Sequence, residues 1–435
     1  MAGQATTRKR SNSVKETLDA LEPTRTDHRV VASGASTRSP RSSSSSTTHP
    51  AAATTNASKL PWQATGRLSW LVSPAKTLSV IVATVSTYFV LERCVPSYST
   101  LHGNSNPLRP LLLISYPLEP TLADRGEQKY GKGLDDVVFL SFYIIVFSFL
   151  RQSITEYLIR PVAKRLGLRT ESKQARFMEQ AYAIVYFSAS GAFGLYVMSR
   201  QPTWWYKTEH FWLEYPHWRM AGVLKSYYLL QFSYWCQQMI ILVLGLEKPR
   251  SDFKELVIHH VVTLWLVGWS YLINLTMIGT AIFVSMDLPD ICLAFSKCLN
   301  YLDLQRTSEV SFVFFLVVWH YMRHYLNLKI LWSVWNEYDL IPSEWRSFVT
   351  SERGWWLAKG LGTGEIPAWM KYHIFAPILA LQLVNTFWSY LIWRILFRML
   401  SGNNARDVRE EGEDEEEERQ QQQQQHEVAE AKKDR

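Results

Sequence analysis

Apolar residues in this chain gather into long blocks, which charged and polar segments separate. Eight such blocks are centred near residues 84, 146, 188, 235, 265, 287, 320 and 385. A helix needs about 20 mostly apolar residues to cross a membrane, because each residue advances about 1.5 Å. The first block (Thr77 to Val90) and the second (Val137 to Leu150) are short and need their flanking residues. The pattern predicts an all-α, polytopic membrane helix bundle with about eight transmembrane helices.

Polar tails flank these blocks and suggest how the chain is divided. Residues 1–60 are rich in Ser, Thr, Arg and Ala, so they cannot offset the entropy of folding and are expected to be disordered. Residues 61–136 would hold the first helix and a loop, and residues 137–400 the main bundle. Residues 401–435 form an acidic and then glutamine-rich tail. The N-terminal tail lacks the apolar core of a cleavable signal peptide, so the first span is expected to act as the signal anchor.

Composition and charge narrow the class further. The chain has 435 residues, of which 47% are hydrophobic, and a net charge of +7. In a soluble protein that charge would suggest nucleic acid, but here the basic residues lie beside the spans, and we find no nucleic-acid motif. The four cysteines show neither a disulfide framework nor a paired CxxC spacing, so no structural metal is expected.

The basic residues also predict an orientation. The loop after the second span carries six basic residues against one acid, and further bases follow the fourth, sixth and eighth spans. The loops on the other side, 95–136 and 333–372, have acids that balance their bases. The positive-inside rule therefore places both termini in the cytosol. There, Lys432 and Lys433 near the C-terminus fit a dilysine retrieval signal, although two lysines in a polar tail also arise by chance.

An aromatic segment lies on the side predicted to be lumenal. Residues Trp204 to Trp218 read WWYKTEHFWLEYPHW. This composition is typical of an interfacial aromatic belt. We expect this segment to anchor the protein in the membrane rather than to contact a substrate.

Four ionisable residues lie in two neighbouring spans. His259 and His260 open one span, and Asp287 and Asp290 lie inside the next. An ionisable side chain in a span costs roughly 2.5–3.5 kcal/mol or more, so this group marks a candidate functional site. If the spans cover about residues 255–273 and 277–297, His259 and Asp290 lie roughly 6 and 10 Å below the same membrane surface. Asp287 would lie about one turn deeper on the same helix face.

The local geometry favours a polar cavity at this level. His260 points about 100° away from His259, so one imidazole can face the aspartates while the other faces a neighbouring helix. Pro289 lies between the two acids and cannot donate a hydrogen bond to the Ser285 carbonyl, which predicts a kink. The backbone groups that a kink frees suit a polar cavity better than a lipid-facing surface.

A histidine and a carboxylate that face each other suit acyl transfer. Imidazole, with an ordinary pKa of ~6.5, is a suitable base or nucleophile, and a carboxylate can fix its tautomer. One alternative is that these polar residues only hold helices together. Another is a metal site that includes His320 and His324, which are four residues apart on the seventh span. Their greater depth separates them from His259, and a di-iron site needs more histidines, so we expect no metal.

The spacing of these residues resembles the motif of the ceramide synthases, the longevity-assurance branch of the TLC-domain proteins. Their pattern HHxxT, SY, G, DxxD and KxxxY is matched by His259, His260, Thr263, Ser270, Tyr271, Gly279, Asp287, Asp290, Lys297 and Tyr301. The likeness extends from roughly Gln174 to Leu396. Met286 stands where animal members usually have a histidine, and residues 95–136 leave too little room for a homeobox-like insert. Both departures favour the fungal type.

The resemblance implies a function and a fold. Ceramide synthases of the endoplasmic reticulum N-acylate a sphingoid base, sphinganine or phytosphingosine, with a long or very-long-chain fatty acyl-CoA, and no cofactor is expected. The family fold is a bundle of six or seven helices around an acyl tunnel. By similarity, His259 would accept the acyl group or act as the base, with Asp290 as its partner. His260 and Asp287 would position and polarise these groups.

The resemblance also implies binding partners. Lys248, Arg250, Lys254 and Arg306 could attract the phosphates of coenzyme A, although ordinary orientation charges explain them equally well. Lys297 and Tyr301 are further candidates for substrate binding. Fungal relatives work with a small single-span accessory subunit, and a homo- or hetero-dimer is a further possibility. The alternative is a TLC-domain protein that only binds or moves lipids, but such a protein would be expected to lack the complete HH and DxxD set.

Overall fold

The structure is a computed structural model. It describes residues 73–94, 106–124, 126–168, 170–213, 215–244, 253–342 and 369–401, all of which belong to one compact unit, Ser58–Arg435. The N-terminal tail, Lys248, Arg250 and the C-terminal dilysine lie outside these described residues.

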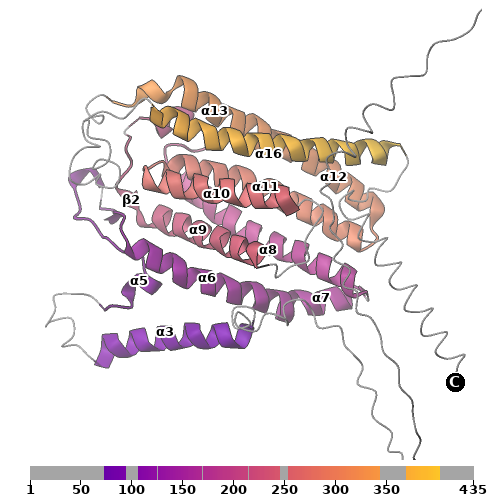
Figure 1. Cartoon of the computed structure of the whole chain (residues 1–435), viewed down its shortest axis with the longest axis horizontal. Coiled ribbons are helices and arrows are strands. Elements are labelled where there is room, and N and C mark those ends of the chain that lie inside the picture. Colours follow the sequence, from indigo (N-terminus) through magenta and orange to yellow (C-terminus); the bar gives the residue numbers. More distant parts are fainter. Residues whose placement is uncertain are drawn as a thin grey trace, which may run out of the picture. The chain divides into compact units, whose positions relative to one another are not determined.

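Helical structure is present at each of the eight predicted centres (Figure 1). The long helices are α3 (Pro74–Cys94), α6 (Asp135–Ser153), α8 (Glu171–Ser199), α9 (Gly222–Val243), α10 (Phe253–Leu272), α11 (Thr276–Tyr301), α12 (Gln305–Trp319) and α16 (Trp369–Leu400). A π-helix, η5 (His320–Leu326), joins α12 to α13 (Asn327–Asn336). The shorter elements are α5 (Arg109–Leu112), η2 (Leu122–Asp124), β1 (Lys129–Tyr130), η3 (Ile154–Ile159), α7 (Arg160–Arg165), η4 (Thr208–Phe211), β2 (Met220–Ala221) and η6 (Tyr338–Leu340).

Six of the described helices are long and apolar enough to cross a membrane. Both short apolar blocks gain flanking residues as expected: α3 has 21 residues, and the second span runs for 31 residues from Asp135 to Arg165. The other two predicted spans fall outside this set for different reasons. Helix α9 carries three glutamines, and α12 has only 15 residues before the π-helix begins. The all-α, multi-pass membrane fold is thus confirmed.

Helix α11 lies at the centre of the bundle and α3 at its edge (Figure 1). In the most apolar stretch of α11, 61% of residues are buried, against 6% for α3. Helix α11 packs against α8 and α12, while α10 packs between α9 and α16. Gly279 of the motif lets α11 approach α9, because a Cβ atom there would overlap the Tyr228 ring. This arrangement sets the two motif helices, α10 and α11, inside the bundle.

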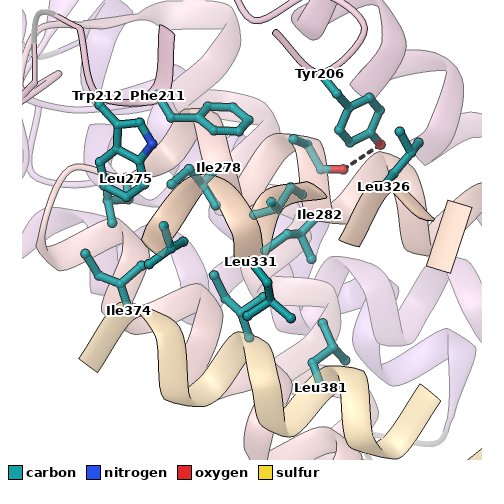
Figure 2. Close-up of a cluster of buried hydrophobic side chains, with 14 of the residues drawn as sticks. Tyr206, Phe211, Trp212, Leu275, Ile278, Ile282, Leu326, Leu331, Ile374 and Leu381 are labelled. Carbon is teal, nitrogen blue, oxygen red and sulfur yellow. Dashed lines mark hydrogen bonds between the residues drawn. The ribbon is translucent and has the colours of Figure 1, made fainter. Parts of the chain in front are cut away.

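The aromatic segment packs into one end of the bundle instead of only lining an interface. Tyr206, Phe211, Trp212 and Tyr215 are buried in a core cluster with residues of α10, α11, α13 and α16 (Figure 2). The Tyr206 hydroxyl donates to the Ala281 carbonyl oxygen at 2.9 Å. Trp204 and Trp205 remain exposed, as expected of a belt. The belt prediction was therefore wrong for the buried rings, and the polar groups of Tyr206, Trp212 and Tyr215 find hydrogen-bond partners inside the protein.

A buried ion pair secures the same end. Strands β1 and β2 pair antiparallel, and Lys225, which follows β2 on α9, places its ammonium 2.7 Å from Asp136 Oδ1 at the start of α6. The ammonium also donates to the carbonyl oxygens of Ser115 and Gly131 at 2.8 and 2.7 Å. Asp136 Oδ2 accepts from the Tyr271 hydroxyl at 2.8 Å. We call Lys225 and Asp136 the hairpin pair, because they lie beside the paired strands β1 and β2. Together with Tyr271, this pair ties α6 and α9 to the end of α10.

Candidate active site

The motif side chains converge around a cavity of about 330 Å³. Helix α10 supplies His259 and His260 near its start, and α11 supplies Asp290 about three turns before its end. Lys297 and Tyr301, on the last turns of α11, also line this outer cavity. The structure thus brings together five of the residues that the sequence singled out.

A second, narrower cavity of about 50 Å³ continues into the bundle. Its walls come mainly from apolar residues of α9, α10, α11 and α16, among them Leu266, Ile282 and Ile378. The outer cavity, by contrast, includes Arg151, Gln180, Gln238 and Asn300 on its walls. The outer cavity is therefore the more polar of the two.

Four side chains line both cavities and therefore stand between them. We call this set the neck: Trp235, His259, Asp290 and Arg323. The neck holds an imidazole, a carboxylate, a guanidinium and an indole within a mostly apolar bundle. Ionisable groups in such surroundings are costly, so their meeting at one level indicates a functional site.

Asp290 is held by an arginine. Arg323 Nη2 lies 2.7 Å from Asp290 Oδ1 and also donates to the Met286 carbonyl oxygen at 3.0 Å. Its other terminal nitrogen donates to Asn385 Oδ1 at 3.3 Å, and the guanidinium lies 4.4 Å from the centre of the Trp319 ring. The π-helix η5 supplies Arg323, and π-turns are frequent at functional sites. We call Arg323 and Asp290 the neck pair.

The two histidines differ in their surroundings. His260 is buried, and its Nδ1 lies 2.8 Å from the Leu256 carbonyl oxygen of its own helix. His259 Nδ1 is buried without a hydrogen-bond partner among the described residues. The His259 ring packs at 5.8 Å from Trp235 and 5.0 Å from Trp388. Within the described residues, no hydrogen bond joins His259 to Asp290, whose ionic partner is Arg323.

Asp287 belongs to a separate polar network beside the neck. It is 1% exposed and lines neither of the two cavities. Its Oδ2 accepts from Ser190 Oγ at 2.7 Å and from Gln231 Nε2 at 3.0 Å, which links α11 to α8 and α9. Asp290 thus faces the cavities, while Asp287, one turn earlier on α11, joins α11 to α8 and α9.

The candidates for coenzyme A binding divide by position. Lys297 and Tyr301 line the outer cavity. Lys254 and Arg306 are exposed near the starts of α10 and α12 and do not line it. Sequence reasoning missed Arg151, which does line it and donates to Gln238 Oε1 at 3.0 Å.

The two histidines weighed as metal ligands have hydrogen-bond partners on α16. His324 Nε2 lies 2.5 Å from Ser389 Oγ, and its Nδ1 lies 2.7 Å from Gln382 Nε2. Trp393 Nε1 donates to His320 Nε2 at 3.1 Å. In the part of the chain that the structure describes, no group of three or more His, Cys, Asp or Glu side chains is placed to hold a metal ion.

Sequence reasoning also missed Arg323 and Trp235 as members of the site. The cost of an ionisable group in a span, which marked the aspartates, applies equally to Arg323 and could have marked it. Trp235 offered no such signal, because an indole in a span usually serves packing.

Comparison with known proteins adds the relatives of the chain. A family model described as the TLC domain matches residues 176–394, which contain the whole neck. A sphingosine N-acyltransferase of Schizosaccharomyces pombe is 42% identical over 303 residues, which cover 70% of this chain and 74% of that protein. A ceramide synthase of Saccharomyces cerevisiae is 39% identical over 332 residues, or 76% of each chain. Ceramide synthase 4 of Bos taurus is 28% identical over 242 residues, or 55% of each chain.

Proposed function

The chain belongs to the ceramide synthases, an acyltransferase branch of the TLC-domain family, and from this premise we propose that it joins a fatty acyl group to a sphingoid base at the neck. The donor would be a long or very-long-chain acyl-CoA and the acceptor sphinganine or phytosphingosine. The products would be the corresponding ceramide and coenzyme A, with no cofactor.

The observation that supports this proposal is the meeting of two unlike cavities at His259 and Asp290. A fatty acyl-CoA is itself polar on one side of its thioester and apolar on the other. The more polar outer cavity suits the pantetheine arm, and the apolar inner cavity suits the first part of the acyl chain. The thioester carbon would then lie at the neck, beside the imidazole.

The chemistry would centre on His259. In the covalent route, an imidazole nitrogen attacks the thioester carbon, the carbon–sulfur bond breaks, and coenzyme A leaves through the outer cavity. The amine of the sphingoid base then attacks the acyl-imidazole, and its proton balances the thiolate released earlier. In the direct route, His259 only takes the proton while the amine attacks the thioester.

Other predicted residues would support these steps. Asp290, fixed by Arg323, would set the electrostatics beside the imidazole. Asp287 and His260 would position the neck through α8, α9 and α10. Lys297, Tyr301 and Arg151 would contact coenzyme A in the outer cavity, while Lys248, Arg250, Lys254 and Arg306 would attract its phosphates at the entrance.

We further propose a location in the endoplasmic reticulum membrane, with both termini in the cytosol. The start of α10 and the end of α11 line the outer cavity, and the predicted cytosolic bases Lys254 and Arg306 lie on α10 and α12 near these ends, which agrees with entry of coenzyme A from the cytosol. The dilysine signal, the single-span accessory subunit and the dimer stay predictions from the sequence and the family resemblance.

The test is a His259→Ala protein, compared with His210→Ala as a histidine substitution outside both cavities. We expect His259→Ala to fold normally and to lose ceramide synthesis, while His210→Ala keeps it. Intact-protein mass after incubation with acyl-CoA alone separates the routes. An acyl adduct on wild type that His259→Ala lacks supports the covalent route, and its absence under turnover conditions supports direct transfer. Full synthesis by folded His259→Ala would contradict a histidine-centred reaction.

A further inference from the structure

Two hydrogen-bond donors in the neck have no acceptor. Arg323 Nε and Trp235 Nε1 are both buried and lack a hydrogen-bond partner among the described residues. Both residues line the outer and the inner cavity. Buried donors are nearly always paired, so an unpaired one calls for an explanation. The four side chains of the neck include two such unpaired donors.

The surroundings of Arg323 show that this is not a loosely placed side chain. The residue is 4% exposed, and both terminal nitrogens are engaged, by Asp290 and Met286 on α11 and by Asn385 on α16. The Trp319 ring supports the guanidinium plane. These contacts fix the group from three elements and leave Nε as its one nitrogen without a hydrogen-bond partner among the described contacts.

The reaction supplies the acceptor that these donors lack. Whether His259 or the amine attacks, a bond forms to the thioester carbon and the carbonyl π electrons move onto oxygen. That oxygen becomes an anion until the carbon–sulfur bond breaks, when the electron pair leaves with sulfur. In a site that excludes water, such charge needs donors that are already in place. Backbone N–H groups within the surrounding helices are engaged in helical hydrogen bonds and cannot serve as these donors. Pro289, next to Asp290, has no backbone N–H group at all.

We propose that Arg323 and Trp235 form the oxyanion site of this enzyme. In the acyl-CoA complex the thioester oxygen accepts hydrogen bonds from Arg323 Nε and Trp235 Nε1. These bonds strengthen as the tetrahedral intermediate forms, and the guanidinium charge offsets the new negative charge. Asp290 keeps the guanidinium in place and prevents an uncompensated cation in the resting enzyme. This assignment rests on the proposed acyl transfer at the neck, but it holds for either route.

Trp235→Phe is the sharpest test, because it removes the indole N–H and keeps an aromatic ring. We expect kcat to fall by about 100-fold, the usual effect of losing one such donor, with little change in KM for acyl-CoA. Arg323→Lys keeps the charge but loses the planar fork, and a fall in kcat of similar size is expected. Trp332→Phe, an exposed indole of α13 outside both cavities, should leave kcat unchanged.

A second readout separates hydrogen bonding from a purely structural role. Acyl-CoA labelled with ¹³C at the thioester carbon would be bound to His259→Ala, and its carbonyl stretch recorded by infrared difference spectroscopy. We expect a lower frequency than for acyl-CoA in micelles, and a shift back toward the micelle value when Trp235→Phe is added. Arg323→Lys added in the same background should give the same shift.

The two proposals fail in different ways. A kcat close to wild type in Trp235→Phe, or a carbonyl band that neither added substitution moves, would overturn the oxyanion site. An effect confined to KM would overturn it as well. Retained synthesis by His259→Ala would instead overturn the role of the histidine, and the carbonyl band would still decide whether Arg323 and Trp235 bind the thioester oxygen.

Discussion

Among the described residues, the hairpin pair and the neck pair each have a buried basic side chain, but their surroundings differ. In the hairpin pair, the Lys225 ammonium donates to two backbone carbonyl oxygens and lies 2.7 Å from Asp136 Oδ1, and neither residue lines the outer or inner cavity. In the neck pair, Arg323 Nε has no hydrogen-bond partner among the described residues, and the Asp290 side chain is 26% exposed. A buried ion pair alone is weak evidence for stability or for function. What distinguishes these two is hydrogen-bonding capacity left over beside a cavity, which indicates a ligand.

The largest effect on stability should come from breaking the hairpin pair. Lys225→Met leaves the Asp136 carboxylate buried without its cation, which typically costs about 3–5 kcal/mol in the free energy of unfolding. Thermal unfolding in detergent micelles should show this, while turnover per folded molecule stays near wild type. Lys129→Met is the matched control, since its pair with Glu127 is partly exposed and worth about 0–1 kcal/mol. Equal melting temperatures for the two variants would contradict a structural role for Lys225.

Breaking the neck pair should have the opposite effect, a large loss of turnover with a smaller loss of stability. Asp290→Asn keeps the size of the side chain but removes its charge, so Arg323 loses its ionic partner beside His259. We expect turnover to fall by about 100-fold, as for loss of an oxyanion donor, because the Arg323 guanidinium is no longer held in place. The melting temperature should fall less than in Lys225→Met, because the Asp290 side chain is 26% exposed whereas that of Asp136 is 4% exposed.

A control for Asp290→Asn is Asp303→Asn, whose side chain is 82% exposed and whose contact with Lys173 is 3.9 Å long. It should change neither turnover nor melting temperature. If Asp290→Asn instead behaves as Lys225→Met is expected to, losing stability but not turnover per folded molecule, the neck pair is structural and the contrast between the two pairs disappears.

The smallest effect should come from an exposed base near the start of α10, outside the lining of the outer cavity. Lys254→Ala removes a charge that lies outside the lining, so KM for acyl-CoA should rise by no more than about fivefold, the equivalent of about 1 kcal/mol. The rise should vanish at high salt, where exposed charges are screened. Lys297→Ala, within the lining, should raise KM more and keep its effect at high salt. The reverse ranking would mean that coenzyme A does not enter through this cavity.

Much of this arrangement could be predicted from the sequence, because a bilayer limits the possibilities. Apolar blocks had to become helices, and depth along consecutive spans placed His259 and Asp290 at one level, where both line the outer cavity. The different environments of Asp287 and Asp290 could not be predicted. The rotation of α11 depends on how Ser190 and Gln231 pack against it, and those contacts come from helices distant in sequence.

Other features gave no usable local signal. An aromatic segment at a membrane surface and one folded into the bundle have the same composition, so the burial of Phe211 and Trp212 depends on tertiary contacts. The Arg323 side chain that pairs with Asp290 lies in a π-helix, which apolar periodicity does not reveal. The predicted direct partner of Asp290 was an imidazole, while the structure gives that place to a guanidinium.

The π-helix η5 has a consequence for how the length of this segment can vary. A π-turn accommodates one more residue than an α-helix over the same span, and Arg323 lies in the middle of it. Deleting a single residue between His320 and Leu326 would let the backbone relax into a regular α-helix. Side chains on one flank would then rotate by about 100° relative to the other. Insertions and deletions in most loops are nearly neutral, but one residue here would turn either the guanidinium or all of α13 away from its partners.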